Sequence, residues 1–170
     1  RLLQGDNYPL PKLAVPEQHF ERLKILVVED DSVLLKLYKT VIAAWNLPID
    51  LITAGNGVEG LIRVGRDTPD LMITDLKMPG MSGLALVRHV TENLKETEIV
   101  VITGYATIGG AVEALRTGAE DYLAKPFTDE ELREAVGRAL RKLRGRKSDG
   151  APPPAPPASV AVGHLALHSL

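Results

Sequence analysis

The stretch KILVVE, residues 24 to 29, is a short and almost entirely apolar run that ends in a carboxylate. Near-continuous apolar runs of this length are typical of parallel strands that helices cover on both faces. Because most of these runs are apolar throughout and do not alternate, we expect a buried parallel sheet. Four further runs of similar length follow along the chain: IDLITA (49–54), DLMITD (70–75), EIVVIT (98–103) and EDYLAK (120–125).

The segments between these runs carry apolar residues at helical spacing. Strands that alternate with helices predict an α/β fold, a doubly wound sheet whose crossover connections are right-handed. We therefore expect each helix to turn one apolar stripe towards the sheet. The predicted stripes are Leu34, Leu37, Val41 and Trp45; Leu84, Val87 and Leu94; Ile108, Val112 and Leu115; and Leu132, Val136, Leu140 and Leu143.

The composition excludes several classes of protein. A chain of 170 residues with 45% hydrophobic residues can form one domain with a substantial core, and its net charge of −2 gives no general attraction to nucleic acid. The absence of cysteine excludes disulfides, thiolate metal sites and cysteine nucleophiles. No apolar run approaches the roughly 20 residues that span a bilayer, and no signal peptide is recognisable. We expect a cytoplasmic protein without membrane insertion.

Proline marks the expected domain boundaries. Three prolines lie in residues 9–16 and five in residues 152–157. The first group predicts an extended N-terminal leader over residues 1–22, and the second predicts a polyproline II linker within a flexible, Pro/Ala-rich tail over residues 148–170. The domain is then expected over residues 23–147, and the tail is too short to form an output domain.

The stretch AGNGVEG (54–60) fits the G-x-G-x-x-G pattern of dinucleotide-binding folds, and Asp75 follows at the distance of the ribose-binding carboxylate. In those folds the glycine-rich turn follows the first strand, whereas here a complete strand and helix precede it. The remaining strands are too few for a second mononucleotide half. We favour a tight turn in which Asn56 caps the next helix.

Polar residues gather where the predicted strands end. The first strand ends in Glu29 and Asp30, the third in Asp75, the fourth in Thr103 and the fifth in Lys125. Parallel strands present their carboxyl ends at one edge of a sheet, where ligands bind. Each residue alone has a simpler structural explanation, but together they form an oxygen-only donor set suited to Mg²⁺, with a hydroxyl and an ammonium suited to a phosphoryl group.

Four motifs resemble the receiver domain of two-component response regulators, of the CheY-like superfamily. This resemblance implies a flavodoxin-like (βα)5 sandwich: a five-stranded parallel sheet in the order 2-1-3-4-5 with helices on both faces. It covers about residues 23–145, within the predicted domain of residues 23–147. The motifs are ILVVEDDS (25–32), LMITDLKMPGMSGLAL (71–86), VVITGYA (100–106) and GAEDYLAKPF (118–127).

The resemblance implies a role for each residue of the predicted site. Asp75 would be the phosphoacceptor, and Lys125 would pair with the phosphoryl group. Asp30 would contact Mg²⁺ directly, Glu29 would contact it through water, and the backbone carbonyl of Lys77 would supply another ligand. Glutamate stands at position 29 where aspartate is commoner, which changes the reach of the side chain more than its charge.

The resemblance also implies partners and a conformational switch. A phosphohistidine on a sensor histidine kinase or a histidine phosphotransfer protein would donate the phosphoryl group. Thr103 and Tyr122 would be the switch residues, and the Lys125–Pro126 peptide bond would be cis. The output would be a downstream protein target or a homodimer, contacted through the fourth helix, the fifth strand and the fifth helix. The domain would not be an enzyme beyond its own phosphoryl transfer and autodephosphorylation.

Other functions remain open from the sequence. The chain could be a degenerate receiver that acts only as a docking module, or a receiver fragment of a larger transcriptional regulator or hybrid kinase. A phosphohydrolase with an aspartyl nucleophile is disfavoured, because Lys77 stands where that class has a second aspartate. Residues 138–147 hold six Lys or Arg and no acid, which we interpret as a solvated helix end without direct binding of nucleic acid.

Overall fold

The structure is a computed structural model that describes residues 22–104 and 107–149. Apart from Arg22 and the end of the last helix, the predicted leader (1–22) and the predicted tail (148–170) lie outside the described residues. Among the helices that are described, none combines the length and the apolar character needed to cross a bilayer.

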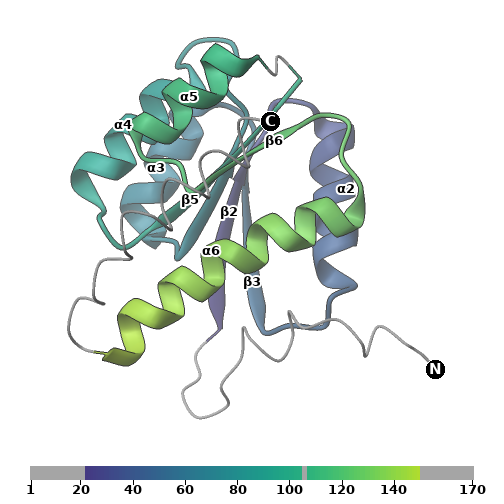
Figure 1. Cartoon of the computed structure of the whole chain (residues 1–170). Helices are drawn as coiled ribbons and strands as arrows, with labels where there is room; N and C mark the ends of the chain where they lie inside the picture. Colours follow the sequence, from purple (N-terminus) through teal and green to yellow (C-terminus); the bar gives the residue numbers. More distant parts are fainter. Residues whose placement is uncertain (1–21, 105–106, 150–170) are drawn as a thin grey trace.

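The described residues alternate strictly between strands and helices, as the spacing of the apolar runs predicts (Figure 1). The strands are β2 (Leu23–Val28), β3 (Ile49–Ala54), β4 (Leu71–Thr74), β5 (Glu98–Thr103) and β6 (Asp121–Ala124). The helices are α2 (Ser32–Ala43), α3 (Gly57–Asp67), α4 (Gly83–Asn93), α5 (Ile108–Thr117) and α6 (Asp129–Asp149).

The five strands form one parallel sheet in the order β3-β2-β4-β5-β6, which is the predicted order 2-1-3-4-5. Helices α2 and α6 cover one face, while α3, α4 and α5 cover the other (Figure 1). Successive strand residues face opposite sides, so Ile25 and Val27 join one core cluster while Leu26 and Val28 join the other. Burial on both faces explains why the strands are apolar throughout.

The predicted helix stripes are only partly right. The stripe of α6 is correct, since Leu132, Val136, Leu140 and Leu143 are all buried. In the other helices, three residues that were predicted to be buried are exposed. Apolar periodicity shows that a helix has an apolar face, but it does not fix which residues at the border of that face contact the sheet. The exceptions are Leu37 in α2 and Ile108 and Val112 in α5, which are exposed by 45%, 80% and 44%.

In both helices a neighbouring position is buried instead. In α2, Tyr38 is 1% exposed and its ring stacks on Phe127 with the ring centroids 5.6 Å apart. In α5 the fully buried residue is Ala114, and this small side chain lets the helix lie close to the sheet. Ile108 and Val112 then face outward.

The glycine-rich stretch at residues 54–60 forms a helix cap, as predicted for Asn56. The Asn56 side chain accepts a hydrogen bond from the Glu59 amide at 2.8 Å, and the Glu59 carboxylate accepts one from the Gly55 amide at 2.8 Å. The pattern resembles a capping box, except that the Glu59 carboxylate binds the amide of the residue before the N-cap. A Cβ atom at Gly57 would lie 2.5 Å from the carbonyl oxygen of Met81, so this glycine permits a close contact with the loop after β4.

One side of the basic end of α6 packs against acidic groups, so the interpretation of this segment as a solvated helix end is only partly right. Three basic residues at four-residue spacing share one side of the helix. Their partners lie on β5, on β6 and just before β6, and two of them, Glu98 and Asp121, are buried carboxylates. The pairs are Arg138 with Asp121 (Nε–Oδ2 2.7 Å), Lys142 with Glu120 (Nζ–Oε1 2.9 Å) and Arg146 with Glu98.

Candidate functional site

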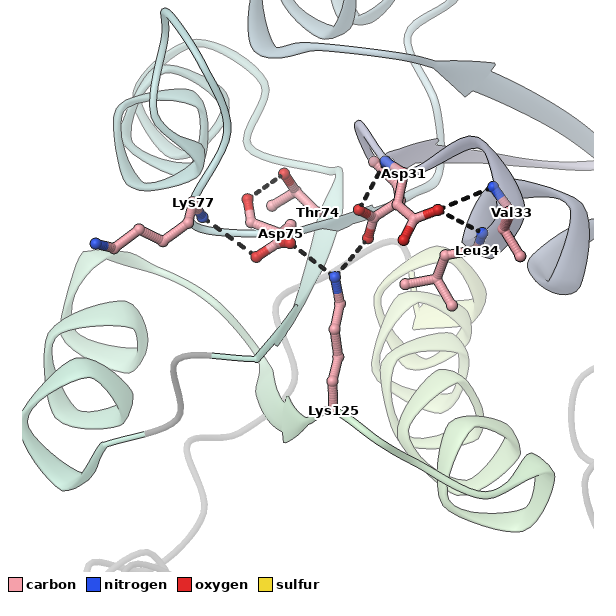
Figure 2. A network of polar contacts seen from close by, with 8 residues as sticks. Asp31, Val33, Leu34, Thr74, Asp75, Lys77 and Lys125 are labelled. Carbon is pink, nitrogen blue, oxygen red and sulfur yellow. Dashed lines mark hydrogen bonds and ion pairs between the residues drawn. The ribbon is translucent and has the colours of Figure 1, made fainter.

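Two of the predicted site residues, Asp75 and Lys125, meet beyond the carboxyl ends of the strands (Figure 2). Val28 and Thr74 are paired across the neighbouring strands β2 and β4, so Glu29 and Asp75 follow two adjacent strand ends. Lys125 follows β6 and reaches the same place from the edge of the sheet. The topology therefore brings together three residues that lie far apart in the sequence.

Three carboxylates form the acidic part of this site. Glu29, Asp30 and Asp75 each offer a carboxylate oxygen, and these oxygens lie within 4.8 Å of one another. Glu29 and Asp75 are buried, with exposed fractions of 1% and 7%, while Asp30 is exposed. Such a cluster carries more negative charge than one cation can neutralise, and it forms a set of oxygen ligands for a hard divalent ion.

The Lys125 ammonium bridges two of these carboxylates. Its Nζ atom donates to Glu29 Oε1 at 2.8 Å and to Asp75 Oδ2 at 2.7 Å (Figure 2). Burial lowers the pKa of Lys125, but the hydrogen bonds to Asp75 and Glu29 outweigh it, so the pKa lies above its ordinary value. Lys125 therefore remains a cation at neutral pH.

Burial and hydrogen bonds change the pKa of the Glu29 carboxylate in opposite directions. Burial raises the pKa of Glu29 above its ordinary value, although the hydrogen bonds from Lys125 and from the Asp31 amide oppose the change. The Asp31 amide donates to Glu29 Oε2 at 3.2 Å, while the Asp31 side chain caps α2 by accepting from the Val33 amide at 2.9 Å. Glu29 is thus linked to the N-cap residue of α2.

The backbone around Asp75 fixes its side chain. The Lys77 amide donates to Asp75 Oδ1 at 3.2 Å, and the Thr74 hydroxyl donates to the carbonyl of Asp75 at 2.9 Å. The Lys77 side chain is exposed. Both oxygens of the Asp75 carboxylate therefore accept hydrogen bonds, one from the loop that follows it and one from Lys125.

Gly83, which no motif in the sequence marked as a site residue, closes the loop that follows Asp75. The Gly83 amide donates to the carbonyl of Leu76 at 2.9 Å, and a Cβ atom at position 83 would lie 1.8 Å from the carbonyl oxygen of Asp75. Only glycine fits at this distance. The signal in the sequence is the Ser-Gly pair at the start of α4, but it does not reveal what the glycine touches.

The two predicted switch residues lie on the neighbouring strands β5 and β6. Thr103 is fully buried, and its carbonyl accepts a hydrogen bond from the Lys125 amide at 2.9 Å. Tyr122 is half-buried against the core cluster beneath α3, α4 and α5. Its hydroxyl lies near the first turn of α5, 3.3 Å from where a Cβ atom at Gly110 would stand. The Lys125–Pro126 bond is cis, as expected.

The chain matches a known protein family over most of this domain. The family model of the response regulator receiver domain matches residues 25–137. The regulatory protein LuxO of Vibrio cholerae is 37% identical over 123 residues, which cover 72% of this chain and 27% of LuxO. The regulator of RpoS from Escherichia coli K12 is 38% identical over 120 residues, which cover 69% of this chain and 34% of that protein.

Solved structures of receiver domains also resemble this chain. A response regulator receiver domain protein from Clostridium thermocellum superposes with a TM-score of 0.67 at 30% identity and covers 72% of this chain and 97% of that one. A CheY-like receiver domain protein from Methanospirillum hungatei has a TM-score of 0.68 at 25% identity and covers 74% of this chain and 99% of that one. The chain spans about a third or less of the length of the two curated relatives above.

Proposed function

Because the chain belongs to the response regulator receiver domain family of two-component signalling, we propose that Asp75 accepts a phosphoryl group from a phosphohistidine. The donor would be a sensor histidine kinase or a histidine phosphotransfer protein in the cytoplasm. The observation that carries the proposal is the contact of one lysine with a carboxylate cluster drawn from separate βα units. Lys125 would neutralise part of the charge on a transferred phosphoryl group, and the three acids would hold the cation that neutralises the rest.

In the proposed step a carboxylate oxygen of Asp75 attacks the phosphorus atom of the phosphohistidine. A P–O bond forms to Asp75, the P–N bond breaks, and the imidazole nitrogen of the donor retains the bonding electrons and takes up a proton. The Lys77 amide and Lys125 orient the Asp75 carboxylate before the donor arrives. Lys125 is then placed to exchange its contact with Asp75 Oδ2 for a contact with a phosphoryl oxygen.

The donor set fits Mg²⁺, since it consists of oxygens that lie within 4.8 Å of one another and includes no histidine or thiolate. Asp30, Asp75 and the backbone carbonyl of Lys77 would hold the ion directly, and Glu29 would contact it through water. When bound, the ion would neutralise negative charge that develops on the phosphoryl oxygens. The exposed position of Asp30 gives access from solvent.

The proposed signal begins with Thr103 and Tyr122. An added phosphoryl group brings strong acceptor oxygens and about −1.5 to −2 charge in a typical monoester, so nearby donors are attracted to it. The Thr103 hydroxyl would move to donate to a phosphoryl oxygen, and the Tyr122 ring would turn into the space released. This movement would bias an existing equilibrium at the surface formed by α5, β6 and α6. A downstream protein target or a second copy of this chain would bind that surface.

Incubation with acetyl phosphate tests the proposed acceptor. The full chain should gain one phosphoryl adduct in its intact mass when Mg²⁺ is present, and the adduct should disappear in excess chelator. The physical reason is that three carboxylates with one ammonium repel an incoming phosphoryl group unless a further cation is bound. Uptake that is unchanged by the chelator would contradict the proposed metal, and no uptake with Mg²⁺ would favour a degenerate receiver that only docks partners.

Amide hydrogen exchange tests which residues change their structure on phosphorylation. The first turn of α5 contains Gly109 and Gly110, each of which costs about 0.8–1.0 kcal/mol relative to alanine in a helix interior. This turn depends on the Thr107 hydroxyl, which accepts from the Gly110 amide at 2.9 Å. We expect residues 107–112 to change their protection when acetyl phosphate and Mg²⁺ are added, while residues 60–64 of α3, outside the proposed surface, stay constant. Equal protection of residues 107–112 in both states would exclude this site of change.

The lengths of the curated relatives indicate the kind of protein to which this domain belongs. The curated relatives are much longer than this chain, and their names describe regulators. We propose that the receiver serves as the phosphorylated part of such a regulator. The paired bases of α6 do not favour a direct contact with nucleic acid, because Arg138, Lys142 and Arg146 already face carboxylates of the domain.

A further inference from the structure

Strand β3 lies at one edge of the sheet that the described strands form, and only half of its backbone groups face β2. The Leu23 amide donates to the carbonyl of Pro48 at 2.8 Å, and the Glu29 amide donates to that of Ala54 at 3.0 Å. Backbone groups alternate in direction along a strand. The even-numbered residues of β3 therefore face β2, and the odd-numbered ones turn their amides and carbonyls to the outer side.

Three residues of β3 present their backbone on this outer side: Ile49, Leu51 and Thr53. The Ile49 carbonyl accepts from the Arg22 guanidinium at 2.8 Å, and Arg22 also pairs with Asp50 at 2.7 Å, so the residue before β2 already contacts this edge. Within residues 22–104 and 107–149, no strand pairs with the outer backbone of the half-buried Leu51 and Thr53. An open strand edge of this kind binds an extended segment.

The N-terminal sequence has a proline pattern that fits such an edge. Proline lacks an amide hydrogen, and a strand tolerates it only where that position faces away from the neighbouring strand. In YPLPKLAV (8–15), Pro9 and Pro11 stand two residues apart, so both can face away from β3. Pro16 has the opposite parity and would end the pairing. The residues that would face β3 each have an amide hydrogen, and they are Tyr8, Leu10, Lys12 and Ala14.

The length and direction of the chain also fit. Leu23 pairs with Ile49 where both strands begin, so a segment that runs towards β2 alongside β3 would be antiparallel to β3. Between residue 15 and the start of β2 the chain must pass β3, a displacement of two strand spacings or about 10 Å. Residues 16–21 can extend over about 20 Å, which is sufficient.

We propose that residues 8–15 of the same chain bind the outer edge of β3 as a further, antiparallel strand, paired with the backbone of Leu51 and Thr53. Pro9 and Pro11 would then lie on the new outer edge of the sheet. They offer no amide donors there, so they would prevent the addition of another strand. This contact requires neither a metal ion nor a phosphoryl group, and it goes beyond the proposed function.

Residue-resolved amide hydrogen exchange, measured by NMR on the full chain without Mg²⁺ or a phosphoryl donor, tests the proposal. The measured quantities are the exchange rates of the Leu51 and Thr53 amides, relative to that of the Ile52 amide, which faces β2. Wild type is compared with Leu10→Pro, which removes an amide that would face β3. The matched control is Leu13→Pro, the same replacement at an odd-numbered position. Circular dichroism verifies that each variant is folded.

Leu10→Pro should accelerate the exchange of Leu51 and Thr53 about tenfold, the factor expected for the loss of backbone hydrogen bonds at an edge strand. Leu13→Pro should stay within about twofold of wild type, because its position needs no amide donor. The Ile52 amide should exchange equally in all three proteins. Equal rates at Leu51 and Thr53 in wild type and Leu10→Pro, or an equal acceleration in Leu13→Pro, would overturn the proposal.

Dilution distinguishes the chain's own segment from a second copy. The protection of Leu51 and Thr53 in wild type should be unchanged when the protein is diluted tenfold, because the proposed contact is intramolecular. Protection that declines on dilution would mean that a second copy occupies the edge, and the proposal would be wrong. The result is independent of phosphoryl uptake, so failure of the proposed function at Asp75 leaves this test intact.

Discussion

Asp75→Asn should abolish phosphoryl uptake from acetyl phosphate. The substitution keeps the shape of the side chain but replaces the attacking carboxylate with an amide, which is a far weaker nucleophile. It also removes the charge that Lys125 contacts at 2.7 Å. Intact mass after incubation with acetyl phosphate and Mg²⁺ measures the result: wild type should carry the adduct, and the variant should carry none.

Asp50→Asn is the matched control for this experiment. Asp50 is an aspartate on the edge strand β3, where it pairs with Arg22 at the exposed surface and has no contact with the acidic cluster. Its replacement should leave the yield of adduct unchanged. If Asp75→Asn still gained a phosphoryl group, and peptide mapping placed it on Asp30, the assignment of Asp75 as the acceptor would be wrong.

Gly83→Ala should destabilise the domain strongly and disturb the site at the same time. The added methyl group would stand 1.8 Å from the carbonyl oxygen of Asp75 and 2.7 Å from the Cα atom of Leu76, so it meets backbone that cannot rotate away. We expect a loss of about 3 kcal/mol or more in the free energy of unfolding, the upper part of the range for overpacking. Urea denaturation measures the loss, and the yield of phosphoryl adduct should fall in conditions where the variant is still folded.

Gly65→Ala provides the opposite control. Gly65 lies in the last turn of α3, and a Cβ atom there would meet nothing within 4 Å. Alanine should stabilise the helix by roughly 0.5–1 kcal/mol because it restricts the unfolded chain. The two glycines thus predict changes of opposite sign in the same assay. A mild effect at Gly83, similar in size to that at Gly65, would show that the loop after Asp75 adapts more freely than its contacts indicate.

The fold was predictable from the sequence because its signal is local and repeated. A parallel strand that is covered on both faces must be apolar throughout, and runs such as residues 24–29 and 98–103 show this directly. The strand order followed from the resemblance to a family and not from periodicity. The meeting of Glu29, Asp30, Asp75 and Lys125 was predictable as well, since parallel strands end at one edge of a sheet.

Other features depend on how the elements pack, and the sequence does not report them. An apolar stripe on α5 suggested that Ile108 and Val112 face the sheet, but the helix approaches through Ala114 and leaves both exposed. The basic end of α6 looks solvated when it is read alone. Its partners Glu98 and Asp121 lie on strands that are distant in sequence, and only the folded sheet places them beside Arg146 and Arg138.

The sequence by itself determined the parallel α/β architecture, the strand ends that carry the polar groups, and through family resemblance the role expected for each group. The spacing of apolar residues in a helix and the apolar character of a buried strand are properties of single segments, so they can be recognised in the sequence. Tertiary structure decided the contacts that give those groups their chemistry: the ammonium of Lys125 between Glu29 and Asp75, and the close approach at Gly83. These depend on side-chain reach and on packing to within an ångström, which arise only when separate segments occupy the same space.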